Sequence, residues 1–166
     1  MVGALVRWRG SMNPGGRGGL GGRGEEDVGL VAGKLTGRLI GMAIGIHKAL
    51  GPGLFEQFYE DCLALELSRA GLQFERQIVL PGVYEGVRFD RGYRADLIVE
   101  GTVLIEIKSV DAILPVHENQ LLTYLYLSEC RVGLLLNFKT TLLKNGLRRY
   151  VHTASPRSPS PPCPPS

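Results

Sequence analysis

Cysteine is scarce in this sequence. The 166 residues include three cysteines, Cys62, Cys130 and Cys163, which are far apart and show no CxxC spacing. An odd number of isolated cysteines argues against a disulfide framework and against a zinc site built from paired cysteines. Such cysteine usage suits a reducing compartment, so we expect a cytoplasmic protein.

Long apolar runs and an excess of one charge are also lacking. No apolar run reaches the ~20 residues that a membrane-spanning helix needs. The opening stretch "MVGALVRWRG" is too short and too soon interrupted by arginine for a signal peptide. The net charge is +3, but residues 35–152 hold 13 basic and 13 acidic residues. Overall charge therefore gives no argument for nucleic-acid binding.

Glycine and proline are abundant only near the two ends of the chain. Residues 1–34 hold 11 of the 23 glycines, and the final stretch "SPRSPSPPCPPS" holds 6 of the 10 prolines. Segments of this composition bury too little apolar surface to offset the entropy lost on ordering. We therefore predict a disordered extension over residues 1–34, one folded domain over 35–152, and a disordered tail over 153–166.

The central region alternates between helical and strand patterns. Apolar residues recur at helical spacing after Thr36, a plausible N-cap, and Gly71 is placed to end a second helix. The predicted class is α/β, with a mixed β-sheet flanked by helices in the order ααβββαββ. The expected helices are 36–50, 54–70 and 115–129, and the expected strands are 74–81, 93–99, 103–110, 131–138 and 147–152.

Three charged residues interrupt two of the predicted strands, in "GYRADLIVEGTVLIEIKSV". They are Asp96 on one strand and Glu106 and Lys108 on the next. Side chains alternate between the faces of a strand, so Glu106 and Lys108 point the same way. Charges are unfavourable inside a sheet unless they are paired or bound to a metal. The arrangement of these three residues therefore needs a chemical explanation.

The loop between the two strands decides whether Asp96 joins the other two. A two-residue turn would turn Asp96 away from Glu106. A three-residue loop over 99–101, with Gly101 in the left-handed conformation, pairs residue 98 with 102 and gathers all three charges on one face. It also forms a continuous apolar face on the other side. The hydrophobic pattern therefore favours the odd loop.

Two carboxylates on neighbouring strands form a hard-oxygen site suited to Mg²⁺ or Mn²⁺. A lysine beside them can orient a metal-bound water and offset the charge of a phosphate transition state. The spacing thus suits metal-assisted hydrolysis of phosphodiester bonds. The alternative is a solvent-exposed strand face that carries a simple Glu/Lys pair.

Further motifs extend this pattern. The stretch "GPGLFEQFY" carries Gly53, Glu56 and Tyr59 at the spacing Gly-x-x-Glu-x-x-Tyr, while Gln120 and Tyr124 lie four apart on one face of a predicted helix. Together with the blocks "FERQIVLPGVYEGVRFDRGYRADLIVE", "LIEIKSV", "HENQLLTYL" and "LLLNF", they resemble the GxxExxY protein family over residues 37–151. That family is assigned to the PD-(D/E)XK nuclease superfamily and is closest to RecB-like exonucleases.

The resemblance implies a restriction-endonuclease-like core and a set of functional residues. Asp96 and Glu106 would be metal ligands, Lys108 the catalytic lysine, and Glu56 a helix-borne acid that reaches the same cleft. Gln120 and Tyr124 match the QxxxY motif that positions the active site and the substrate. His47, in "IHKALGPG", matches a family histidine, and Tyr59 is expected to pack in the core with its hydroxyl bonded at the cleft edge. The family often has an acid where this chain has Gly45, so any role of that acid is lost.

The expected function is that of a Mg²⁺- or Mn²⁺-dependent nuclease. Its partner would be nucleic acid, with DNA as the first choice and RNA as the second. The domain has no obvious specificity module, which suits a homo-oligomer or a protein partner. The alternative is a nuclease-fold module that binds nucleic acid or protein with little or no catalytic activity. The presence of Asp96, Glu106 and Lys108 together favours the enzyme, since a pure binder needs no buried acid pair.

Overall fold

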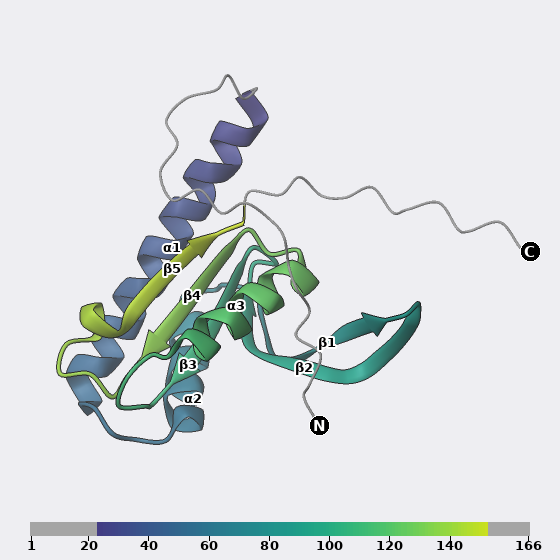
Figure 1. Ribbon diagram of the computed structural model, residues 1–166. Helices are drawn as coiled ribbons and strands as arrows, with labels where there is room; N and C mark the ends of the chain where they lie inside the picture. The colour runs from purple at the N-terminus through teal and green to yellow at the C-terminus, as the bar shows by residue number, and fades with distance from the viewer. Residues whose placement is uncertain (1–22, 153–166) are drawn as a thin grey trace, which may run out of the picture.

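The computed structural model describes residues 23–152 of the chain. Three α-helices, five strands and one short 3-10 helix follow one another in the predicted order (Figure 1). The predicted C-terminal tail and the first 22 residues lie outside the described part. The elements are α1 (Arg23–Leu50), α2 (Glu56–Arg69), β1 (Phe74–Tyr84), β2 (Val87–Val99), β3 (Val103–Lys108), α3 (Pro115–Ser128), β4 (Val132–Asn137), η1 (Leu143–Gly146) and β5 (Leu147–Val151).

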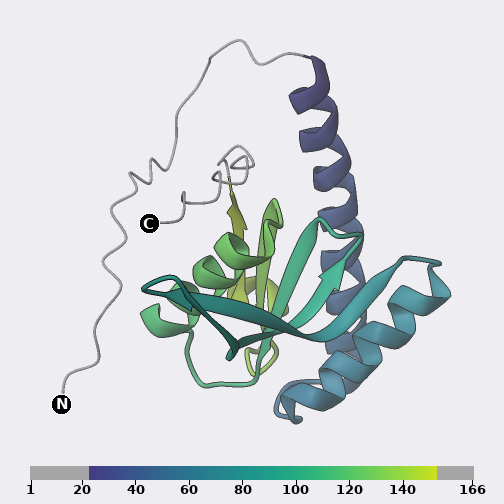
Figure 2. The same cartoon turned by 90° about the vertical axis from the view of Figure 1, so that its right-hand side faces the viewer.

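The five strands form one mixed sheet in the order β1-β2-β3-β4-β5. Only the pair β3 and β4 is parallel, and α3 makes the crossover between these two strands. Helix α3 covers one face of the sheet, and α1 and α2 cover the other (Figure 2). The predicted α/β class with a mixed, helix-flanked sheet is therefore confirmed. Within residues 23–152 no helix is both long and apolar enough to cross a membrane.

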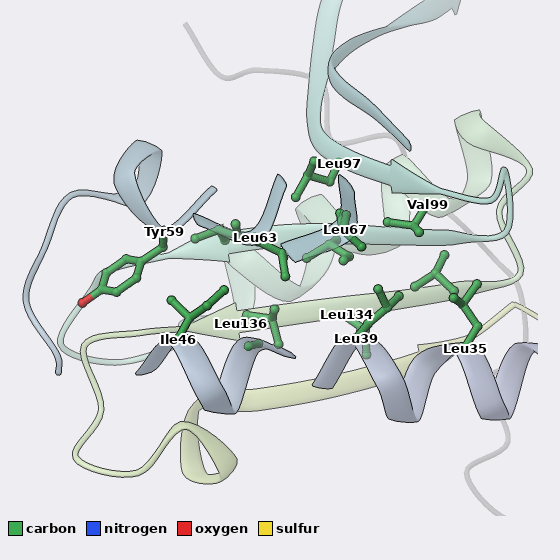
Figure 3. Close-up of a cluster of buried hydrophobic side chains, with 14 of the residues drawn as sticks. Leu35, Leu39, Ile46, Tyr59, Leu63, Leu67, Leu97, Val99, Leu134 and Leu136 are labelled. Atoms are coloured by element: carbon green, nitrogen blue, oxygen red, sulfur yellow. The ribbon is translucent and has the colours of Figure 1, made fainter. Parts of the chain in front are cut away.

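The larger core lies between the sheet and the pair α1 and α2. Figure 3 shows side chains from both helices meeting side chains of β2 and β4. Leu39, Leu63 and Leu134 are among those with no exposed surface. Burying one such leucine contributes about 1.5–3 kcal/mol. The strands alternate apolar residues toward this core, which fixes the faces to which their remaining side chains point.

Helix α1 begins earlier than predicted. Thr36, expected as the N-cap, lies inside the helix, and its hydroxyl donates to the carbonyl of Ala32 over 2.5 Å. Residues 23–34, expected to be part of a disordered extension, are helical, and Ala32 is buried. The glycines misled the prediction: Gly33, Gly37, Gly41 and Gly45 all fall on the exposed side of the helix. The opposite side packs in the core and offsets their low helix propensity.

Helix α2 ends as the sequence predicts. Gly71 has a φ of 67° and donates to the carbonyl of Ser68 over 3.1 Å, while Leu72 donates to the carbonyl of Leu67 over 3.1 Å. These two bonds form a Schellman motif, in which a glycine at this position avoids the strain of a left-handed side chain.

Strands β1 and β2 form a longer hairpin than predicted. They continue to a two-residue turn in which Glu85 and Gly86 both have positive φ, the geometry of a type I′ turn. The predicted strands were 74–81 and 93–99, so the outer part of the hairpin was missed. In the structure Pro81 lies at a register shift between Leu80 and Gly82, where no donor is required. The outer part of the hairpin projects from the sheet (Figure 1).

Candidate active site

The loop between β2 and β3 sets the geometry of the site. Val99 pairs with Val103, so the loop has three residues, 100–102, and Gly101 has a φ of 57°. The predicted odd length is confirmed. The loop lies one residue later than predicted, which shifts the register by two and keeps the paired residues 97–99 and 103–105 on their predicted faces.

Glu106 is the most buried acid of the site, with 2% of its surface exposed. It lies two residues beyond Leu104, on the face of the sheet that α3 covers. Its Oε1 accepts from the Nζ of Lys108 over 2.6 Å. Its Oε2 is buried and, among the described residues, has no hydrogen-bond partner. Burial, followed by the charge of Asp96, raises the pKa of Glu106 to about 7, although Lys108 acts against the rise.

Lys108 provides the positive charge of the site, and its side chain is 13% exposed. Burial lowers the pKa of this ammonium group, but the charge and hydrogen bond of Glu106, together with the charges of Glu56 and Asp96, raise it overall. Lys108 is therefore a cation at neutral pH, so it can offset negative charge but has no free electron pair to take up a proton.

Asp96 lies where β2 leaves β3. The ladder between these strands ends at the pair Leu97 and Ile105, and the next amide of β3, that of Ile107, donates to Asp96 Oδ2 over 2.8 Å. Ala95 and Leu97 pack on opposite sides of the sheet, so β2 twists at this point. Burial raises the pKa of Asp96, which the bond from Ile107 and the charge of Lys108 partly oppose.

A residue that the sequence analysis did not single out lies beside Asp96. Gln77 of β1 has a φ of 51°, a strained value for a side chain other than glycine. Its Nε2 donates to Glu60 Oε2 over 2.5 Å and makes a longer contact, 3.5 Å, with Asp96 Oδ1. Glu60 is buried in α2 and also accepts from Arg76 over 2.8 Å. This network links α2 to Asp96 through β1, and no short sequence pattern marks it.

Tyr59 closes the loop that leads into α2. Its hydroxyl donates to the carbonyl of Gly51 over 2.6 Å and accepts from the amide of Leu54 over 3.2 Å. Its ring is fully buried and stacks on Phe138 with centroids 4.1 Å apart. The structure thus places Tyr59 in the core, with its hydroxyl holding the turn that contains Gly53, whose φ is 97°.

Glu56 lies at the end of β3. Its Oε1 accepts from the amide of Ser109 over 2.9 Å, and the hydroxyl of Ser109 donates to the carbonyl of Leu54 over 2.7 Å. These bonds fasten the start of α2 to the residue after Lys108. Glu56 is exposed, and its charge has a minor effect on Asp96, Glu106 and Lys108. Within residues 23–152 no three His, Cys, Asp or Glu side chains converge closely enough to hold a metal, so Glu56 does not complete a set of three acidic ligands.

Gln120 and Tyr124 lie together on α3. The Nε2 of Gln120 donates to the hydroxyl of Tyr124 over 2.6 Å, and the Tyr124 ring meets Tyr93 of β2 edge-on at 5.8 Å. Helix α3 covers the face of the sheet on which Glu106 lies. Across the described chain, neither residue is hydrogen-bonded to Asp96, Glu106 or Lys108, and the pair bonds internally on this face.

His47 lies elsewhere. It is 7% exposed at the end of α1, and its Nε2 lies 2.8 Å from the carbonyl of Thr140. Its ring packs near Phe138, with centroids 6.1 Å apart. This histidine joins α1 to the loop after β4, and its imidazole is occupied by that contact.

Comparison with known proteins identifies the family. The family model described as the PD-(D/E)XK nuclease superfamily matches residues 33–150, which include most of α1 and almost all of the following elements to β5. No curated protein and no solved structure matches the chain. The superfamily to which the resemblance pointed is thereby confirmed, as is the restriction-endonuclease-like fold. The chain belongs to the PD-(D/E)XK nuclease superfamily.

Proposed function

We propose that this protein is a metal-dependent nuclease that hydrolyses phosphodiester bonds, with Mg²⁺ or Mn²⁺ held by Asp96 and Glu106. The observation that carries the proposal is Glu106 Oε2, a buried oxygen without a hydrogen-bond partner among the described residues. Such an oxygen is unfavourable unless something satisfies it. A divalent cation would do so and would also neutralise the repulsion between the two acids. The oxygen donors suit a hard cation.

Each residue of the site then has a role. A bound metal would supply an activated water and withdraw charge from the phosphate. Lys108, a cation beside Glu106, would stabilise the negative charge that develops on the phosphate oxygens. Glu56 would hold the end of β3, and so Lys108, in place through Ser109. Gln120 and Tyr124 would position the substrate on the α3 side.

The substrate that we propose is nucleic acid, with DNA as the first choice. The superfamily's description as nucleases supports this class. The spacing of Gly53, Glu56 and Tyr59 supports placing the chain in the GxxExxY branch, and a homo-oligomer or a protein partner would supply the specificity that one small domain lacks.

The test combines metal binding with cleavage. Purified full-length protein is incubated with single- and double-stranded DNA and RNA in Mg²⁺, Mn²⁺ or EDTA, and metal-dependent stabilisation is measured in parallel. Asp96→Ala should lose both the stabilisation by metal and the cleavage. Lys108→Ala should retain metal binding and lose most of the cleavage, because the lysine acts on the phosphate rather than on the ion. Glu75→Ala, an exposed acid on β1, is the matched control.

Two results would contradict the proposal. Undiminished stabilisation by metal in Asp96→Ala would remove the proposed metal site. Equal cleavage by Lys108→Ala and the unaltered protein would show that the cleavage comes from elsewhere and would favour the nuclease-fold binding module.

A further inference from the structure

The outer part of the β1–β2 hairpin exposes a row of aromatic side chains. Tyr84 is 62% exposed, Phe89 51% and Tyr93 42%. This part of the hairpin extends beyond the sheet (Figure 2). Large aromatic rings are unfavourable in water, and within residues 23–152 no further layer covers the outer part of this two-stranded hairpin. The rings are therefore available to a ligand.

The three rings lie on one face of the hairpin. Tyr84 pairs with Val87 and Gly82 with Phe89, and directly opposed residues share a face. Since alternate residues also share a face, Tyr84 and Phe89 lie on the same side. A Cβ on Gly82 would lie 3.7 Å from the ring of Tyr93, so that ring occupies the space above the glycine on this same face.

The aromatic face, made of Tyr84, Phe89 and Tyr93, is continuous with the candidate active-site face. Tyr93 pairs with Leu80, and Leu80 packs under α3. The ring of Tyr93 contacts the ring of Tyr124 edge-on. Tyr124 is the partner of Gln120, and Glu106 lies on the side of the sheet that α3 covers. A ligand that lies along the hairpin is thus directed toward α3 and that side of the sheet.

The charge of this segment suits a polyanion. Residues 87–94, "VRFDRGYR", hold three arginines and one aspartate, whereas the folded region as a whole is neutral. Arg88 and Arg94 are exposed. They alternate with Phe89 and Tyr93 along β2, so they project from the reverse side of the hairpin, where Arg88 also donates to Asp90 over 2.7 Å. The positive charge of the segment therefore lies behind the aromatic rings, within reach of a strand that wraps the hairpin. Nucleic acid offers both groups that this combination recognises, flat bases and phosphates.

We propose that the aromatic face binds single-stranded nucleic acid by stacking bases on Tyr84, Phe89 and Tyr93, and leads the strand to the site of Glu106 and Lys108. The inference rests on the proposed nuclease function for the destination of the strand, but the binding itself does not. Stacking on side chains requires bases whose faces are free, and duplex bases are already stacked on one another. The preferred substrate is therefore a single strand or an unpaired end, with little sequence preference.

Binding without cleavage tests this directly. Full-length protein in EDTA is titrated into labelled single-stranded DNA, single-stranded RNA and duplex DNA, and fluorescence anisotropy is followed. The unaltered protein should bind single strands at least tenfold more tightly than duplex. Each of Tyr84→Ala and Phe89→Ala should weaken single-strand binding by about 5-fold to 100-fold, the range for the loss of one stacked base. Because both rings are exposed, the melting temperature should stay within a few degrees.

Matched variants separate stacking from other causes. Tyr84→Phe keeps a flat ring and should bind like the unaltered protein. Tyr126→Ala removes a similarly exposed tyrosine, 51% exposed, from α3 and should also have no effect. Stronger binding of DNA than RNA, or the reverse, would identify which single strand is the ligand.

The outcomes distinguish this inference from the proposed function. Cleavage that prefers duplex, together with binding unaffected by Tyr84→Ala and Phe89→Ala, overturns the inference and leaves the nuclease intact. Single-strand binding that depends on both rings in a protein without cleavage supports the inference and rejects the nuclease. If instead the two variants abolish a concentration-dependent dimer seen by sedimentation and leave single-strand binding unchanged, the aromatic face contacts a second copy and the inference is wrong.

Discussion

Raising the pH from about 5 to about 8 should destabilise the metal-free protein, because Glu106 must then lose a proton inside the fold. Its pKa is 4.5 in an ordinary setting and is raised to about 7 by burial and by the charge of Asp96. Between these values the folded protein holds a proton that the unfolded chain has released. The resulting stability is fully present below about pH 4.5 and is lost as the pH rises through about 7. At about 1.4 kcal/mol per pH unit, the loss amounts to about 3 kcal/mol.

The assay is urea denaturation in EDTA over this pH range, with Glu106→Gln as the test variant. Glutamine has no proton to lose, so the free energy of unfolding of Glu106→Gln should lack this decline, and the difference from the unaltered protein should change by about 3 kcal/mol across the range. In thermal scans this corresponds to roughly 10 °C. Glu75→Gln, which alters an exposed acid, should keep the decline. Parallel pH profiles for Glu106→Gln and the unaltered protein would refute the reasoning.

Three further predictions concern the surroundings of the site. Tyr59→Phe keeps the stacked ring and loses both hydroxyl bonds to the loop before α2, so urea denaturation should show a loss of about 1–2 kcal/mol; an unchanged midpoint would show that the loop needs no such tie. Gly146→Ala would bring a Cβ to 2.5 Å from the carbonyl oxygen of Asn137 and should lower stability by about 1–3 kcal/mol in the same assay. Gln77→Gly should relieve the strain of a φ of 51° but lose the bond to buried Glu60, so the melting temperature should change by only a few degrees. Cleavage should fall because the side-chain amide beside Asp96 is lost; full activity in this variant would assign Gln77 no positioning role.

The order of the elements could be predicted because its signals are local. "RVGLLLNF" is a continuous apolar run typical of a strand buried on both faces, and residues 132–138 are all buried. Gly71 marks the end of α2 through its own backbone conformation. The meeting of Asp96 with Glu106 and Lys108 could also be predicted. It required only the knowledge that the loop between the two strands has an odd number of residues.

The support of the site could not be predicted because it depends on distant contacts. Gln77 and Asp96 are 19 residues apart, and they meet because β1 pairs with β2 in a register that places position 77 opposite position 96. The start of α1 was missed for a related reason: glycine is a poor helix former, but the buried face of α1 is stabilised by the sheet and by α2. Local composition indicates neither the contact between Gln77 and Asp96 nor the stabilisation of α1 by its neighbours.

Several polar side chains of the site region bond to main-chain atoms rather than to other side chains. Tyr59 holds the loop before α2, Glu56 the amide of Ser109, Asp96 the amide of Ile107, and His47 lies against the carbonyl of Thr140. Every residue other than proline offers the same amide and carbonyl. Over evolutionary time, the residues at the receiving positions are thus free to change their side chains without losing these bonds. Covariation between homologous sequences would therefore miss these four contacts, although each ties together segments that must stay in place.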